Sequence, residues 1–142
     1  MHVLVALDDS EPGWKALDHA FDTFEDANLT IIHVVDPVNS VYGDMEGGYF
    51  DEGMLENAME TGQELLDKAA ERAEEAGYHE EAVETVLETG RPARGIVDYA
   101  TEHDVDHVVI GSHGRRGVSR VLLGSVAEAV TRRSDVPVTI VR

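Results

Sequence analysis

The chain of 142 residues has the length of one domain, and its 42% hydrophobic content is enough to build a core. Its formal net charge of −18 argues against a protein that coats nucleic acid or an anionic membrane, because phosphate groups require a basic surface. The absence of cysteine excludes disulfides and thiolate chemistry. The apolar run at 3–7 is too short for a signal sequence or a membrane span, so we expect a cytoplasmic protein.

The charge is distributed unevenly along the chain. Residues 1–90 carry 23 acidic and 3 basic residues, whereas residues 91–142 carry 6 acidic and 8 basic ones. An anion site is therefore expected in the last third. Only two lysines accompany nine arginines, and a surface rich in acid and poor in lysine is typical of proteins that stay soluble in concentrated salt. We interpret the composition as halophilic, with ordinary acidity as the alternative.

The hydrophobic pattern predicts strands and helices in alternation. In chain order the expected elements are a strand at 2–7, a helix capped by Ser10, a strand at 29–35, a loop at 38–53, a helix from Met54 that Gly77 ends, a strand at 82–87, a helix opened by Pro92, a strand at 106–110, a helix beginning at Gly124-Ser125 and a strand at 136–141. This alternation predicts one α/β domain over 1–142, an open sheet of five parallel strands with helices on both faces. Ligands of such sheets bind beyond the carboxyl ends of the strands, where the strand order reverses.

The segment after the fourth expected strand has the composition of a phosphate-binding loop. Gly111, Gly114 and Gly117 let the backbone turn tightly and approach a ligand without a Cβ in the way. Gly124 and Ser125 then begin a helix whose free N–H groups favour an anion. The chain lacks the Gly-Lys-Ser/Thr of a Walker A loop, and its glycines do not follow the first strand as those of a dinucleotide fingerprint do. From these residues alone, a phosphate cradle and a structural turn are both open.

The same residues carry a family resemblance. The spacing Gly-two-Gly-nine-Gly-Ser, formed by Gly111, Gly114, Gly124 and Ser125, resembles the ATP-binding signature of universal stress proteins. The resemblance covers nearly the whole chain and includes Val3–Asp8 followed by Ser10, His33-Val34 with Asp36, Gly90 before Pro92, residues 108–114 and residues 136–142. It implies a Rossmann-like fold and a homodimer that pairs through Val136–Val141.

The resemblance also implies a site for ATP, which arrives as its Mg²⁺ complex. Carried over by position, contacts with the phosphates and ribose fall on Gly111, Gly114, Gly124, Ser125 and the Val126 amide. Contacts with the adenine fall on Ala6, Asp8 and Val34, and Ile110 and His113 flank the nucleotide. Arginines of the glycine loop could reach the phosphates or stay solvated, namely Arg115, Arg116 and Arg120.

Two other kinds of site fit the sequence less well. The pair Asp8-Asp9 resembles the acidic pair of response-regulator receiver domains, but a receiver also needs an Asp after the third strand and a Lys after the fifth, and residues 87–90 and 138–142 contain neither. Among seven histidines, His103 and His107 are four residues apart, but the segment between them lies between a helix and a strand, so they need not share a face. We therefore expect no metal site formed by the protein.

Nucleotide binding does not by itself imply catalysis. Phosphoryl transfer usually needs a cation that bridges the phosphates and a group that orients the nucleophile, and no lysine lies near the glycine loop. We therefore assign no catalytic residue, and the leading hypothesis is a cytoplasmic ATP-binding stress-response regulator with no nucleic-acid or membrane partner. The alternatives are a slow ATPase or adenylate-handling enzyme of the same fold, and a dimeric interaction module that binds no nucleotide.

Overall fold

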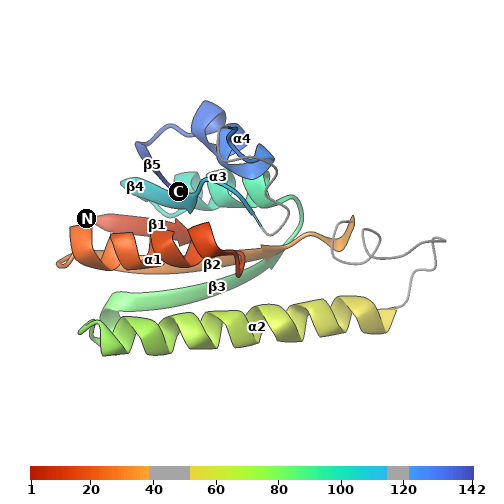
Figure 1. Cartoon of the computed structure of the whole chain (residues 1–142), viewed down its shortest axis with the longest axis horizontal. Coiled ribbons are helices and arrows are strands. Elements are labelled where there is room, and N and C mark those ends of the chain that lie inside the picture. The colour runs from red at the N-terminus through yellow and green to blue at the C-terminus, as the bar shows by residue number, and fades with distance from the viewer. Residues whose placement is uncertain (39–51, 115–121) are drawn as a thin grey trace.

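The computed structural model describes residues 1–38, 52–114 and 122–142, and these form a five-stranded parallel sheet flanked by helices (Figure 1). The strands are β1 (His2–Ala6), β2 (Asn28–Val35), β3 (Val83–Thr89), β4 (His107–Gly111) and β5 (Val138–Val141). The helices are α1 (Glu11–Thr23), α2 (Glu52–Glu75), the short 3-10 helix η2 (Glu80–Ala82), α3 (Pro92–Glu102) and α4 (Ser125–Arg133). The strand order is β3-β2-β1-β4-β5, with every neighbouring pair parallel. The predicted α/β fold is confirmed.

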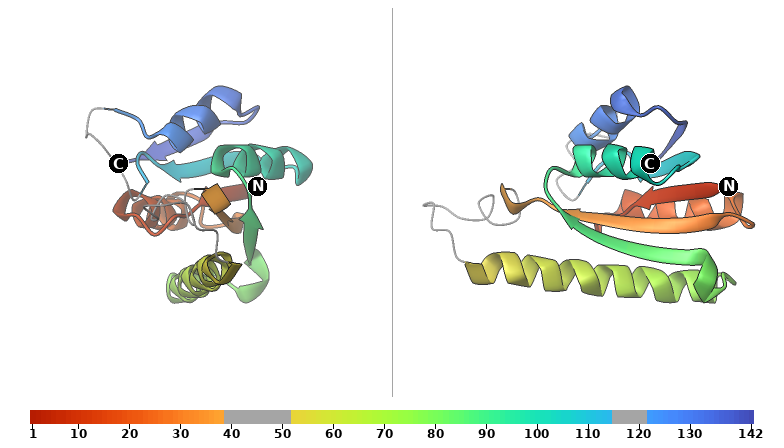
Figure 2. Two further views of the ribbon diagram at one scale, coloured as in Figure 1. Left: turned by 90° about the vertical axis from the view of Figure 1, so that its right-hand side faces the viewer. Right: turned by 180° about the vertical axis from the view of Figure 1, so that it is seen from behind.

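Helices cover both faces of the sheet (Figure 2). On one face, Leu17 of α1 and Leu66 of α2 pack against alternate residues of β1 and β2. On the other face, Ile96 of α3 and Val130 of α4 pack against the intervening residues of the same strands. The central strand β1 is covered from both sides, and its residues 3–5 are completely buried. This double coverage explains why residues 3–6 of β1 are continuously apolar rather than alternating.

Local signals for the helix ends agree with the structure. The Ser10 hydroxyl accepts from Gly13 N at 3.0 Å and caps α1. Gly77, with φ of +96°, follows the end of α2, where Gly77 N donates to Glu74 O and Tyr78 N donates to Ala73 O. This pair of bonds is the Schellman motif, which favours glycine at that position.

Some predicted boundaries are wrong. The third strand runs from Val83 to Thr89 rather than over 82–87, because Ala82 belongs to η2 and pairing with β2 continues to Val35. The fifth strand begins at Val138 instead of 136, because Ser134 forms a tight turn with both the N–H and the carbonyl of Val136. α2 begins at Glu52, before the expected Met54, and most of the predicted loop at 38–53 lies outside the described residues.

α2 is the longest helix, with 24 residues, and its outer surface is acidic. Its inner face is buried at Leu65, Leu66, Ala69 and Ala73. Exposed acidic residues follow the outer face, namely Glu56, Glu60, Glu64, Asp67, Glu71, Glu74 and Glu75. In the ranges that the structure describes, no helix has both the length and the apolar character needed to cross a membrane.

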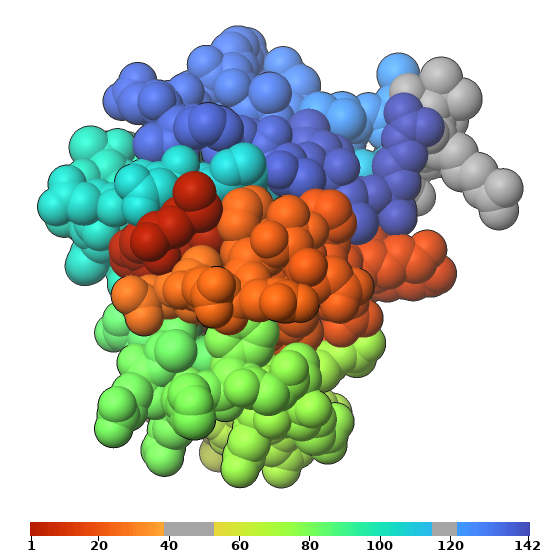
Figure 3. Space-filling view, turned by 90° about the vertical axis from the view of Figure 1, so that its left-hand side faces the viewer, coloured from red at the N-terminus to blue at the C-terminus, as the bar shows by residue number. Residues whose placement is uncertain are grey.

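The two ends of the sheet differ. At the amino end, the start of β1 is enclosed between the turn after α1 and the turn after α3 (Figure 3), where Asn28 N donates to Met1 O and Asp106 N donates to His2 O. At the carboxyl end, β1 stops at Ala6, whereas β2 continues to Val35 and β4 to Gly111. The strand order also reverses between β1 and β4, so the chain leaves these strands toward opposite faces. A notch therefore lies above the end of β1.

Candidate functional site

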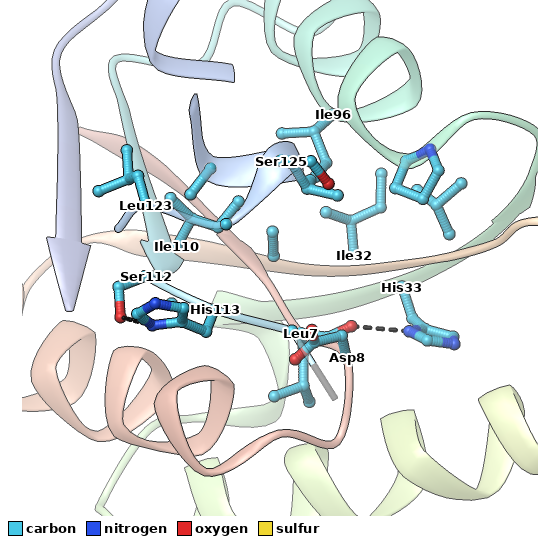
Figure 4. A pocket seen from close by; sticks show the side chains of 18 of the residues that line it. Leu7, Asp8, Ile32, His33, Ile96, Ile110, Ser112, His113, Leu123 and Ser125 are labelled. Atoms are coloured by element: carbon cyan, nitrogen blue, oxygen red, sulfur yellow. Dashed lines mark hydrogen bonds between the residues drawn. The ribbon is translucent and has the colours of Figure 1, made fainter. Parts of the chain in front are cut away.

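The notch contains a pocket of about 430 Å³, formed by the carboxyl ends of β1, β2 and β4 with the amino ends of α3 and α4 (Figure 4). Every residue assigned from the family resemblance lines this pocket: Ala6, Asp8, Val34, Ile110, Gly111, His113, Gly114, Gly124, Ser125 and Val126. Residues that the sequence reasoning missed also line it: Leu7, Ile32, His33, Pro92, Ile96, Ser112, Leu122, Leu123 and Ala127. Gly117 and the three loop arginines lie outside the described residues.

The pocket has an apolar wall and a wall of backbone groups. Ile32 and Val34 of β2, Ile96 of α3 and Ile110 of β4 form the apolar wall. The opposite wall is formed by residues 111–114 at and just after the end of β4, residues 122–124 and the start of α4. Two of the missed residues, Ile32 and Ile96, belong to the apolar wall, and they gave no separate signal in the sequence because pocket walls and core use the same residue types.

The amino end of α4 points its N–H groups at the pocket. Gly124 precedes the helix in an extended conformation, and its own N–H donates to Ser112 O at 2.7 Å. The first bond within the helix runs from Glu128 N to Gly124 O, so the N–H groups of residues 125–127 have no acceptor inside the helix. No side chain among the described residues caps this end. The arrangement favours an anion by partial charge and by hydrogen bonding.

The glycines of the signature serve different purposes. A Cβ on Gly111 would lie 2.7 Å from the carbonyl carbon of Pro12 and 2.8 Å from Gly13 N, so this glycine lets β4 pack against the first turn of α1. A Cβ on Gly124 would lie 3.0 Å from Ser112 O, within the loop itself. At Gly114 a Cβ would lie 2.9 Å from Asp8 Oδ2. Gly111 therefore lines the pocket, but close packing with α1 is what requires a glycine there.

Asp8 is tied to the glycine loop through Ser10. The Ser10 backbone N–H and hydroxyl both donate to Asp8 Oδ1, the former at 3.2 Å. The same hydroxyl lies 3.2 Å from the carbonyl oxygen of His113. Asp9, which has a φ of +61°, makes the turn between Asp8 and Ser10. These contacts hold the half-buried carboxylate of Asp8 at the edge of the pocket.

His113 has one ring nitrogen paired and one unpaired. Its Nδ1 lies 2.8 Å from the hydroxyl of Ser112, which is itself buried. Its Nε2 is buried and has no hydrogen-bond partner among the described residues. Buried polar atoms are rarely left without a partner. A ligand with a hydrogen-bonding group in the pocket would satisfy this nitrogen.

The titratable groups with clearly shifted pKa values lie away from the pocket in the described parts of the chain. Burial lowers the pKa of His107, with a smaller contribution from His19, and burial raises the pKa of Tyr99. Within 1–38, 52–114 and 122–142, no group of three or more His, Asp or Glu side chains is placed to hold a metal ion. The pocket presents groups that can bind a ligand, namely the Asp8 carboxylate, the His113 ring and the free N–H groups at the start of α4.

Comparison with known proteins agrees with this geometry. The profile of the universal stress protein family matches residues 1–142. The chain is 35% identical to the universal stress protein MJ0531 of Methanocaldococcus jannaschii over 142 residues, which cover 99% of this chain and 81% of that protein. The solved structure of MJ0577 from the same organism has a TM-score of 0.83 and 27% identity, covering 99% of this chain and 94% of that one. A universal stress protein solved in complex with cAMP has a TM-score of 0.73 and 27% identity, and the match covers 100% of this chain and 97% of that one. The chain therefore belongs to the universal stress protein family.

Proposed function

We propose that this chain binds ATP, with its Mg²⁺, in the notch above the end of β1. The observation that carries the proposal is the convergence of an apolar wall and a wall of free backbone N–H groups on one pocket. A nucleotide has the same two parts, an aromatic base and an anionic phosphate chain. The relative solved with cAMP supports an adenine nucleotide as the class of ligand.

The phosphate chain would lie on the glycine loop and the start of α4. The N–H groups of Ser125 and Val126, with the hydroxyl of Ser125, offer donors there, and Gly114 and Gly124 keep the backbone free of side chains. Residues 91–142 have more basic than acidic residues, so this part of the chain tolerates a polyanion better than the first 90 residues do. Because the Mg²⁺ arrives on the phosphates, no protein ligand is assigned to it.

The adenine would lie against the apolar wall, beside the end of β2. Ile32 O faces β1, where it accepts from Leu7 N, and Val35 O faces β3, where it accepts from Gly90 N. Since successive residues of a strand alternate in direction, the N–H and carbonyl of Val34 face the side of β1, just beyond its end. Adenine has an acceptor at N1 next to a donor at N6 and matches this pair, whereas guanine has the opposite pattern.

The site fits a binding regulator better than an enzyme. The described residues that line the pocket include no lysine or arginine to bridge phosphates during phosphoryl transfer. We therefore propose a nucleotide-dependent role in the stress response, carried out by a homodimer. β5 is an edge strand of the sheet, and pairing through residues 136–141 of two chains would cover its free backbone groups. A slow ATPase of the same fold is the alternative, and it differs from the regulator in turnover.

Adaptation to concentrated salt is a further part of the proposal. The acidic outer face of α2 lies on a helix that does not line the described pocket, so its charge is not needed for nucleotide binding. Salt screens the repulsion between exposed charges, so concentrated salt stabilises the folded state of a chain with net charge −18. Location in the cytoplasm stays a prediction.

Calorimetric titration with ATP and Mg²⁺ tests the proposed function. Gly114→Val and Gly124→Val should each abolish the binding heat. A valine at 114 would push the Asp8 carboxylate from its place at the edge of the pocket, and a valine at 124 would meet the backbone oxygen of Ser112 within the loop. Ala76→Val, at an exposed position just after α2, is the control and should bind as the unmodified protein does. Retained affinity in both glycine variants would refute the phosphate cradle. A turnover assay with the same nucleotide separates regulator from ATPase, since sustained hydrolysis that Asp8→Ala removes would favour the enzyme.

A further inference from the structure

The backbone ladder between β1 and β2 ends at a side chain. Its last backbone bond runs from Leu7 N to Ile32 O at 2.9 Å. In a parallel ladder the next bond would run from Val34 N to Leu7 O. Instead, the Leu7 carbonyl accepts from Nδ1 of His33 at 2.7 Å (Figure 4), and no bond joins Val34 N to Leu7 O within the described residues.

We propose that His33 is a positioning residue that keeps the Val34 N–H free for the nucleotide base and so sets the preference for adenine. The inference rests on the proposed function, because it concerns the base end of the same pocket. His33 takes the one backbone acceptor that would otherwise draw Val34 into the sheet. The base then meets an open peptide edge, with a donor and an acceptor side by side.

The surroundings hold His33 in this role. A carbonyl oxygen only accepts, so Nδ1 must carry the proton, and the ring orientation follows from that bond. Gly62 of α2 makes room for the ring, since a Cβ there would lie 2.9 Å from His33 Cδ2 and 2.9 Å from Leu87 Cδ1. On the opposite face, Gly95 of α3 admits the Val34 side chain, which a Cβ at that position would approach to 3.2 Å. Helices on both faces therefore fix the end of β2.

Removal of the His33 donor would leave a buried carbonyl without a partner. Leu7 is only 2% exposed, and a buried carbonyl in that position strongly favours a new donor. Val34 N–H is the donor that the register of β1 and β2 brings next. Once this N–H donates to Leu7 O, it is no longer available to N1 of adenine. Guanine carries a hydrogen at N1 and therefore cannot accept a hydrogen bond from the Val34 N–H. The loss of this donor should therefore weaken the binding of adenine nucleotides selectively.

Two variants at this position separate the proposal from a structural role. His33→Asn keeps an N–H at the place of Nδ1, whereas His33→Leu keeps comparable bulk without a donor. We expect the ratio of ATP to GTP affinity, measured by calorimetry, to fall about threefold to tenfold in His33→Leu, as the loss of one hydrogen bond implies, and to be retained in His33→Asn. A merely structural role would weaken both nucleotides alike and leave their ratio unchanged, which would overturn the proposal.

Amide hydrogen exchange at Val34 gives a second readout that needs no bound nucleotide. In the nucleotide-free protein this amide should exchange faster than its neighbours Ile32 and Val35, and His33→Leu should slow it. Protection of Val34 in the unmodified protein would overturn the inference even if ATP binds. If ATP does not bind, the proposed function fails, and the exchange rates still decide whether His33 ends the ladder.

Discussion

Replacement of Gly111 by alanine should destabilise the protein far more than the same change at Gly114. A Cβ at 111 would lie 2.7, 2.8 and 2.9 Å from Pro12 C, Gly13 N and Pro12 O, all of them backbone atoms at the start of α1. These atoms move only if the helix moves. Overpacking a close-packed site costs about 1–3 kcal/mol of stability. Because the neighbouring atoms at this site are rigid backbone, we expect Gly111→Ala to lower the free energy of unfolding by about 3 kcal/mol, the upper end of that range.

The matched change at Gly114 meets a much softer obstacle. Among the described atoms, its Cβ would contact only Asp8 Oδ2, at 2.9 Å, and this side-chain oxygen can shift. Gly114 is also exposed, so we expect a change of about 0.5 kcal/mol or less in the free energy of unfolding. The two variants differ by position alone, and Gly114→Ala is therefore the control for Gly111→Ala.

Urea unfolding followed by far-ultraviolet circular dichroism measures the difference. The midpoint of Gly111→Ala should fall while the slope stays constant, as expected for a change in stability without a change in the surface exposed on unfolding. In thermal unfolding, 3 kcal/mol corresponds to a decrease in Tm of about 6–12 °C for a domain of this size. Equal midpoints for the two variants, at the same salt concentration, would refute the packing role of Gly111.

Three further predictions concern the helix cap, pH and salt. Ser10→Ala removes the cap on Gly13 N and should lower the free energy of unfolding by about 1 kcal/mol in urea, and an unchanged midpoint would contradict this. Burial lowers the pKa of His107 in the folded state, so the unfolded state binds more protons and stability should fall as pH drops below about 6.5. His107→Gln should flatten that part of the pH profile, whereas the exposed His79→Gln should not. Glu60→Gln, between two like charges on α2, should raise the urea midpoint at low salt and leave it unchanged in concentrated salt, and equal gains at both would contradict the screening argument.

The order of strands and helices could be predicted because each element has a strong local pattern. β1 is apolar from Val3 to Ala6, as burial on both faces requires, and Ser10 and Gly77 mark helix ends by their own chemistry. The boundaries of the edge strands were harder to predict. Val136 is apolar like a strand residue, but its hydrogen bonds with Ser134 are a tertiary outcome that periodicity does not show.

The residues of the candidate site could be assigned only through the signature, and their separate roles could not. Gly111 and Gly114 are equivalent in the pattern, yet one faces Pro12 and the other Asp8, about a hundred residues away in the chain. His33 stands next to Val34 in an ordinary strand sequence. Its bond with Leu7 depends on where β1 ends relative to β2, and that register exists only in the folded sheet.

Nuclear magnetic resonance of the ¹⁵N-labelled protein during titration with ATP and Mg²⁺ tests the central claim most directly, because it reports the ligand and the place of binding together. We predict shift changes concentrated at the end of β1, at Val34, in the loop from Gly111 to Gly114 and at the start of α4. Resonances of the outer face of α2 should not move. A spectrum that ATP leaves unchanged, or changes that cluster away from the notch, would contradict the account.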